Sequence, residues 1–291
     1  IADSFDSSTD PYGVLDIRSV YDFDGAFNAL GSSATSIAQL ADPAQATGDS
    51  VNHPALIERP ARFLRIVKGV YLPDNDVRNF NGAAYGVDNS QLMREIIGYT
   101  PIDPDGSVHV RVPADVPLSF SIVDKNGRRV ANTARHNNWI TVRPGETVSC
   151  NGCHEHASGS AHGRPDAQLP SIYAGASGDG VAFTNTVNTF LVNAGDTMAQ
   201  ARTRTLGIAQ LPPSVDIKYT DLWTDTVVAA RAADDIMQFR YNLLDASLSR
   251  PVNRNACAEN NDLSIDGWTG ECRVVINYEQ HIHPLLSLIH I

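Results

Sequence analysis

Five consecutive residues have the types and spacing of a haem-attachment motif: Cys150, Asn151, Gly152, Cys153 and His154. In a C-x-x-C-H motif the two thiols add to the two vinyl groups of a haem, and the adjacent imidazole reaches the iron. The motif therefore predicts a covalently attached haem c, held by Cys150 and Cys153, with His154 as an axial ligand of the iron.

A C-x-x-C pair also occurs as half of a zinc site or as a redox dithiol. His156 or His162 could complete a zinc site around the two cysteines. A thioredoxin-like dithiol would need a strand-to-helix context, which the flanking sequence lacks. We therefore predict haem as the cofactor, with zinc as the alternative.

The second axial ligand of the iron need not lie near the motif in sequence. We favour His281, which lies in an I-N-Y-E-x-H-I segment, and Met198, whose thioether is a known type of haem ligand. The remaining candidates are histidines with no such support: His109, His136, His156 and His162.

The other two cysteines, Cys257 and Cys272, flank a polar, glycine-containing stretch. A disulfide between them would close a loop of about 15 residues and stabilise the fold by roughly 3 kcal/mol in the chain-entropy model. Haem attachment and a disulfide both indicate an oxidising compartment, so we expect an exported protein, periplasmic or extracellular.

The composition excludes some classes of partner. The 33 acidic and 22 basic side chains give a net charge of -11, which argues against nucleic acid and anionic membranes and suits small molecules or basic redox proteins. No apolar run approaches the roughly 18 to 20 residues of a membrane span. Because the chain begins at Ile1 without an export signal, we expect a fragment or a mature form.

Short alternating strands separated by Asp-Gly and Asn-Gly turns predict a mainly β fold, an antiparallel β-sandwich followed by an irregular, partly helical haem-binding segment. A short helix is expected at 196–202, capped by Asp196, and 155–182 is expected to be loop. The expected strands are 14–21, 63–71, 96–99, 107–112, 118–123, 139–142, 215–219 and 273–278.

The predicted organisation has four parts. Residues 1–60 are expected to be extended and draped over a neighbour, as a linker or the remnant of a preceding domain. Residues 61–149 form the β-sandwich, and 150–284 form the haem-binding and C-terminal segment of the same domain. The last residues, 285–291, resemble translated adapter sequence and are interpreted as a non-native tail.

Five short motifs lie between residues 97 and 155: I-G-Y-T-P at 97–101, D-G-S at 105–107, V-P-A-D-V-P at 112–117, R-P-G-E at 143–146 and C-N-G-C-H-E at 150–155. Together they resemble the middle domain of the hydrazine synthase alpha subunit, a domain of exported bacterial multihaem proteins. The likeness is weaker at 197–199, 219–224 and 276–282.

The resemblance implies a larger protein, in which a β-propeller precedes this domain and a further cytochrome c module follows it. One position departs from the hydrazine-forming enzymes, in which a tyrosine four residues after the motif histidine ligates iron and that histidine binds zinc. Ser158 stands there in this chain, and the next tyrosine is Tyr173. The departure favours ordinary ligation of iron by His154 over hydrazine synthesis.

Three functions follow as hypotheses. The first is electron transfer through a six-coordinate haem, to redox proteins or to an adjacent cytochrome c module. The second is a hydrazine synthase-like enzyme that acts on a small nitrogen or oxygen species at a five-coordinate haem. The third is a structural β-sandwich whose C-x-x-C-H is vestigial or holds zinc. No other catalytic motif is evident in the sequence.

Overall fold

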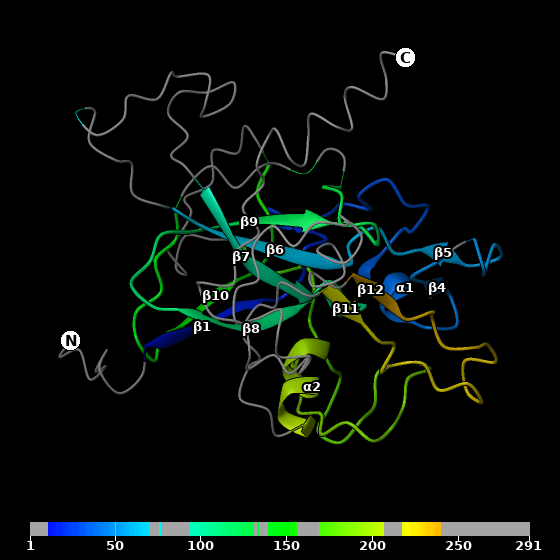
Figure 1. Cartoon of the computed structure of the whole chain (residues 1–291). Coiled ribbons are helices and arrows are strands. Elements are labelled where there is room, and N and C mark those ends of the chain that lie inside the picture. The colour runs from blue at the N-terminus through cyan, green and yellow to red at the C-terminus, as the bar shows by residue number, and fades with distance from the viewer. Residues whose placement is uncertain are drawn as a thin grey trace, which may run out of the picture.

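The computed structural model describes residues 11–49, 51–69, 76, 94–130, 133, 139–155, 169–206 and 217–239. Within them the fold is mainly β, as the sequence predicts. Two three-stranded sheets form its centre, and Figure 1 shows them one above the other. The predicted strand 273–278 and the predicted Cys257–Cys272 disulfide lie outside the described residues.

The first sheet has the order β10-β1-β8. Its central strand, β1 (Tyr12–Ile17), pairs antiparallel with β8 (Val108–Pro113) and parallel with β10 (Thr147–Cys150). Alternation places Val108, Val110 and Val112 on the buried face of β8. The parallel pairing brings the strand that ends in Cys150 against the N-terminal segment, which sequence spacing alone does not reveal.

The second sheet has the order β7-β6-β9, and all its pairings are antiparallel. The central strand is β6 (Phe63–Gly69), flanked by β7 (Arg94–Pro101) and β9 (Leu118–Val123). These strands confirm the predictions at 63–71, 96–99 and 118–123 to within a few residues. The expected strand at 139–142 forms only an isolated bridge between Ile140 and Leu118, because the chain around it is mostly irregular.

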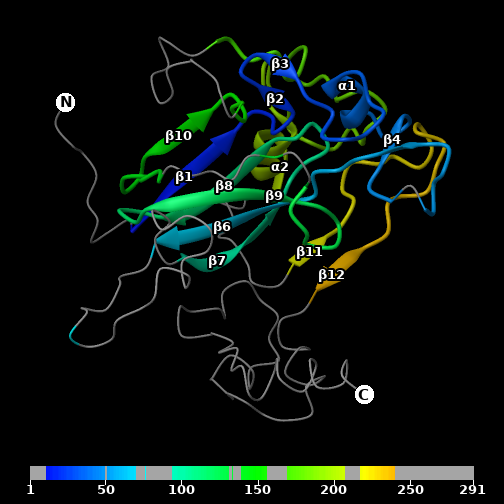
Figure 2. The ribbon, with the colours of Figure 1, turned by 90° about the horizontal axis from the view of Figure 1, so that it is seen from above.

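The two sheets share one apolar core, so the arrangement is sandwich-like. Figure 2 shows the strands of the two sheets running alongside each other. The core takes residues from both sheets and from the N-terminal segment, including Leu15, Ile17, Val20, Tyr21, Phe23, Leu30, Leu40, Leu64, Ile66, Ile97, Val108, Val110, Val112, Leu118, Phe120 and Ile122.

The N-terminal segment differs from the sequence expectation of a draped, extended chain. Apart from β1, it contains the hairpin β2 (Asp22–Phe23) and β3 (Ala26–Phe27), helix α1 (Ile37–Ala41), and the parallel pair β4 (Ala46–Thr47) and β5 (Ile57–Glu58). Its scattered apolar side chains lack a clear period because each short element buries only a few of them. The described part of 1–60 therefore belongs to the same core as the sandwich.

Helix α2 (Met198–Leu206) lies against the outer side of the first sheet, below it in Figure 1. Its first amide groups are capped from a distant loop: Met198 N donates to Asp105 Oδ2 at 2.8 Å, and Ala199 N donates to Ser107 Oγ at 2.9 Å. The helix begins two residues after the expected cap, Asp196. The D-G-S motif thus provides the N-terminal cap of α2.

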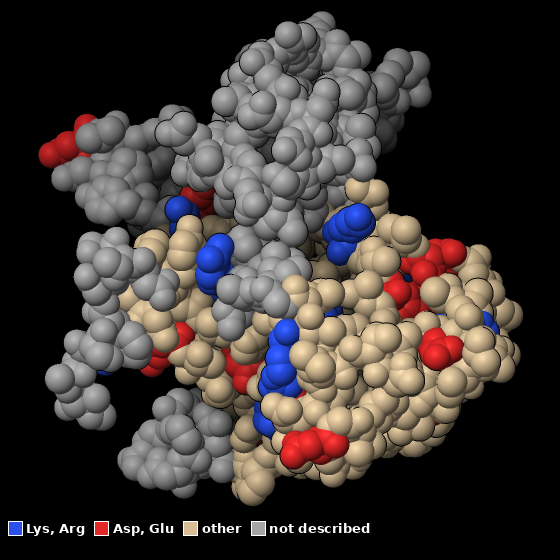
Figure 3. Space-filling view, turned by 90° about the horizontal axis from the view of Figure 1, so that it is seen from below, with Lys and Arg blue, Asp and Glu red and all other residues tan. Residues whose placement is uncertain are grey.

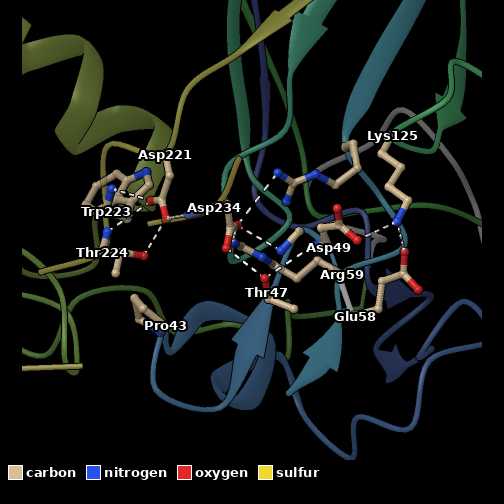
Figure 4. Close-up of polar contacts among 12 residues, drawn as sticks. Pro43, Thr47, Asp49, Glu58, Arg59, Lys125, Asp221, Trp223, Thr224 and Asp234 are labelled. Atoms are coloured by element: carbon tan, nitrogen blue, oxygen red, sulfur yellow. Dashed lines mark hydrogen bonds and ion pairs between the residues drawn. The ribbon is translucent and has the colours of Figure 1, made fainter. Parts of the chain in front are cut away.

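Residues 169–182, the larger described part of the loop expected at 155–182, form no helix or strand, and neither do residues 183–197. The last described elements are β11 (Ile217–Tyr219) and β12 (Met237–Phe239), which pair antiparallel. A buried charged cluster holds this part of the chain to the N-terminal segment: Asp234 accepts hydrogen bonds from Thr47 and Arg59, and Arg231 also binds it (Figure 4).

The charged side chains on the face shown in Figure 3 lie in separate groups, with lysines and arginines interspersed among acidic residues. No helix among the described residues is long and apolar enough to cross a membrane.

Candidate functional site

The C-x-x-C-H motif begins where β10 ends and continues alongside the N-terminal segment. Arg18 N donates to Cys150 O at 2.9 Å, and Cys153 N donates to Asp22 O at 2.8 Å. Asp24 N in turn donates to Cys153 O at 3.1 Å. Backbone hydrogen bonds therefore fix the motif from Cys150 to Cys153 against residues 18–24.

The glycine inside the motif allows this close pairing. A Cβ atom at Gly152 would lie 2.1 Å from Asp22 O and 2.7 Å from Ser19 O. Both neighbours are backbone atoms of the adjacent segment, so they cannot rotate away as a flexible side chain would. The close approach of the two backbones at this point requires glycine.

The two motif cysteines are free thiols at the edge of the apolar core. Both side chains are partly exposed and pack against the shared core cluster. Burial raises the pKa of Cys150 to about 11, with a further contribution from Asp16. Burial raises the pKa of Cys153 to about 12, and its neighbours Cys150 and Asp22 add to that shift.

Raised thiol pKa values mean that both cysteines are protonated at neutral pH. A redox dithiol works through a thiolate, which depends on a lowered pKa in electropositive surroundings. The acidic neighbours of Cys150 and Cys153 produce the opposite effect. The environment therefore disfavours the dithiol interpretation of the motif.

His154 is held by an aspartate from the β2–β3 hairpin. Its Nδ1 lies 2.8 Å from Asp24 Oδ1, and the other carboxylate oxygen, Oδ2, accepts from Glu155 N at 2.8 Å. The His154 side chain is 38% exposed. The sequence reasoning missed Asp24, and the only signal was the D-F-D-G run at 22–25, which is typical of a hairpin turn.

The chain after the motif returns to the same place. Asp22 Oδ2 accepts from Ser171 Oγ at 2.8 Å and from Ile172 N at 3.0 Å. Asn151 Nδ2 donates to Leu169 O at 2.9 Å. Ser171 and its neighbours therefore lie beside the motif, and Tyr173 packs against the same core as the two cysteines.

The structure does not bring Met198 to the motif. The Met198 side chain is fully buried in a second apolar cluster, with Val192 and Trp223, separate from the cluster on which the cysteines pack. Among the histidine candidates, His109 is on β8 and pairs with Asp16, with 2.9 Å between Nδ1 and Oδ1. The candidates outside the described residues are His136, His156, His162 and His281.

Among the residues that the structure describes, no group of three or more His, Cys, Asp or Glu side chains could hold a metal ion. A zinc site requires its protein ligands to converge on one ion. Covalent attachment of haem makes a different demand, because the sulfurs bond to the edge of the porphyrin and only the imidazole must reach iron. The donor set of Cys150, Cys153 and His154 fits this second requirement. His156 and His162, which could complete a zinc site with the two cysteines, lie outside the described residues.

The buried charged cluster is a different kind of site. Asp234 and Arg59 are almost completely buried, and Asp221 accepts from Trp223 N, Thr224 N and Asp234 N at 2.9 to 3.0 Å (Figure 4). Such a closed set of paired charges, away from the motif cysteines, holds segments together. It was not predicted because its members are far apart in sequence.

Comparison with known proteins identifies the segment that leads into the motif. Residues 60–155 match the model of the hydrazine synthase alpha subunit middle domain, about one third of the chain. Among solved structures, hydrazine synthase from Kuenenia stuttgartiensis matches with 21% identity and a TM-score of 0.32, over 50% of this chain and 18% of that chain. This chain thus covers less than a fifth of that protein. No curated protein matches it. Residues 60–155 of this chain are thus similar to the hydrazine synthase alpha subunit middle domain.

Proposed function

We propose that this chain is a c-type haem-binding domain of an exported multihaem protein and that it carries electrons. Cys150 and Cys153 would hold the haem covalently, and His154 would be its axial ligand. When bound, the haem supplies one-electron chemistry between ferric and ferrous iron. The redox partners would be other proteins or an adjacent cytochrome c module, in a periplasmic or extracellular location.

The observation that carries the proposal is the state of the motif. Its backbone is fixed by hydrogen bonds to residues 18–24, and its two thiols are protonated, partly exposed and adjacent to an apolar core. Apolar surroundings exclude water from a prosthetic group and help to set its potential. A solvent-exposed loop with reactive thiolates would not offer such a surface.

The residues of the chain have separate roles in this proposal. The β1–β10 pairing and Gly152 hold the two sulfurs in place, and His154 presents its imidazole at the exposed end of the motif. The second axial position is proposed for His281, since Met198 is packed in a different cluster. His281 lies outside the described residues.

A second candidate is a redox enzyme related to hydrazine synthase. The family match over 60–155 favours it, because the matched family takes its name from that enzyme. Ser158, where the hydrazine-forming enzymes are expected to have an iron-ligating tyrosine, weighs against it. Electron transfer is therefore the function that we put first.

Optical spectra of the chain, produced with a cytochrome c maturation system, test the two candidates. We expect a low-spin ferrous spectrum that carbon monoxide does not change, because two protein ligands fill the axial positions. A high-spin spectrum that shifts with carbon monoxide would favour the enzyme. Haem-free protein that binds one zinc ion per chain would refute both and leave the structural domain.

Cys150→Ala and Cys153→Ala test the attachment residues. Each variant should retain at most one thioether bond, seen as a shifted absorption maximum in the pyridine haemochrome assay. His154→Ala should keep covalent haem but change the spectrum of the iron. A His154→Ala spectrum identical to that of the original chain would show that the axial ligand is assigned wrongly.

A further inference from the structure

The turn that meets His154 has an unusual backbone. Asp24 has a φ of 50° and Gly25 a φ of 82°, so two successive residues are in the left-handed region between β2 and β3. Such a pair is the geometry of a tight hairpin turn, and aspartate, asparagine and glycine tolerate it best. The turn projects one carboxylate toward the end of the motif, where Asp24 meets His154.

Asp24 contacts three successive residues, the last two of the motif and Glu155 after it, with three different groups. Its backbone N–H donates to Cys153 O at 3.1 Å, and its Oδ1 lies 2.8 Å from Nδ1 of His154. Its Oδ2 accepts from the amide of Glu155 at 2.8 Å. The Asp24 side chain is only 14% exposed, so water competes weakly for these contacts.

The chemistry of the pair determines the histidine tautomer. An ionised carboxylate only accepts hydrogen bonds, so the Nδ1 of His154 must carry the proton that it donates to Asp24. In the neutral ring the lone pair is then on Nε2, the nitrogen on the other side. Ligating histidines are held in this way by a partner on the second nitrogen, which also increases the basicity of the ligand.

We infer that Asp24 is a positioning residue for His154. It orients the imidazole ring and selects the tautomer in which Nε2 presents its lone pair, before any cofactor is attached. That this orientation serves to present an iron ligand rests on the proposed haem-binding function. The tautomer itself can be measured in the cofactor-free chain.

Asp22 provides a matched control. It lies two residues earlier in the same hairpin and is also buried, and its backbone oxygen also bonds the motif, at Cys153 N. Its carboxylate, however, binds Gly25 N, Ser171 Oγ and Ile172 N, and none of these is a motif side chain. Asp22→Asn therefore perturbs the same turn without touching the imidazole.

The first measurement is long-range ¹H–¹⁵N NMR of the cofactor-free chain, with the His154 signals assigned by their loss in His154→Gln. In the neutral ring, the original chain and Asp22→Asn should both show a protonated Nδ1 and an unprotonated Nε2. Asp24→Gly removes the carboxylate and suits the left-handed backbone, so it should give a mixture of both tautomers. An unchanged tautomer in Asp24→Gly would overturn the inference.

The second measurement is the reduction potential of the haem-loaded chain. Asp24→Asn keeps the turn but replaces a charged acceptor at the imidazole with a neutral one, so the potential should shift upward. Asp22→Asn removes a charge near Cys153 but leaves the imidazole contact intact, so its shift should be clearly smaller. Equal shifts in both variants would mean a general structural effect and would refute positioning. If the chain takes up no haem, the proposed function fails, and the NMR result still decides the role of Asp24.

Discussion

The stability of the domain should depend on pH through Asp105. This carboxyl is fully buried and receives hydrogen bonds from Met198 N and from both the amide and the hydroxyl of Ser107. Burial is the largest influence and raises its pKa from 3.8 to about 6, and the nearby Asp103 adds to the shift. The hydrogen bonds from Ser107 and Met198 act in the opposite direction.

The magnitude follows from the shift. A difference of about 2 pKa units between the folded and unfolded chains corresponds to about 3 kcal/mol of unfolding free energy. Because the folded state binds the Asp105 proton more tightly, its contribution to stability is greatest below pH 3.8. It falls as the pH rises from 3.8 to about 6, and it is constant above that range.

Urea unfolding of the original chain and of Asp105→Asn, from pH 3.5 to pH 7, measures this contribution. The unfolding free energy of the original chain minus that of the variant should fall by about 3 kcal/mol over the range, because only the original chain ionises at this position. Asp115→Asn, which replaces an exposed carboxyl, is the control and should show no such trend. A difference between the original chain and Asp105→Asn that does not vary with pH would refute the reasoning.

Three further predictions concern the motif and the buried charges. Gly152→Ala should lower the unfolding free energy by about 1 to 3 kcal/mol in thermal or urea unfolding, because the added Cβ would overlap backbone oxygens. Gly178→Ala is the control and should have little effect, because a Cβ there would lie 3.4 Å from its nearest neighbour, Val181 Cγ2. At pH 8, iodoacetamide should alkylate Cys150 about 100-fold more slowly in the folded, haem-free chain than in the urea-unfolded chain. A pKa of about 11 in place of 9.0 lowers the thiolate fraction by that factor. Equal alkylation rates would contradict the burial of the thiol. Asp234→Asn should lower the unfolding free energy by about 3 to 5 kcal/mol, since it leaves buried arginine charges uncompensated, and a loss below 1 kcal/mol would mean that the cluster is not structural.

Local sequence patterns predicted the parts of the fold that depend on local structure. Alternation located β8 and β9, and the Asp-Gly and Asn-Gly turns separated them correctly from their neighbours. The integration of the N-terminal segment could not be predicted in the same way. The segment joins the sandwich mainly through the parallel pairing of β1 with β10, for example Val14 with Thr147. These two residues are far apart in the sequence, so no local hydrophobic period indicates that they pair.

For the candidate site, the sequence identifies the motif residues, and the haem chemistry proposed for Cys150, Cys153 and His154 rests on residue type and spacing alone. The contact of His154 with Asp24 could not be predicted, because it depends on how the β2–β3 hairpin packs against the end of β10. The burial of Met198 in a separate cluster likewise depends on tertiary packing. Methionine also packs in apolar cores, so its residue type alone does not identify it as a haem ligand.

Mass spectrometry of the denatured chain, after expression with a cytochrome c maturation system, tests the central claim most directly. Denaturation removes any haem that is not covalently bound, so the result depends only on the chemistry of the two cysteines. We predict one haem per chain, located on the proteolytic peptide that contains 150–154 and absent from a Cys150→Ala, Cys153→Ala double variant. An unmodified mass for the original chain, with both thiols still open to alkylation after unfolding, would contradict the account.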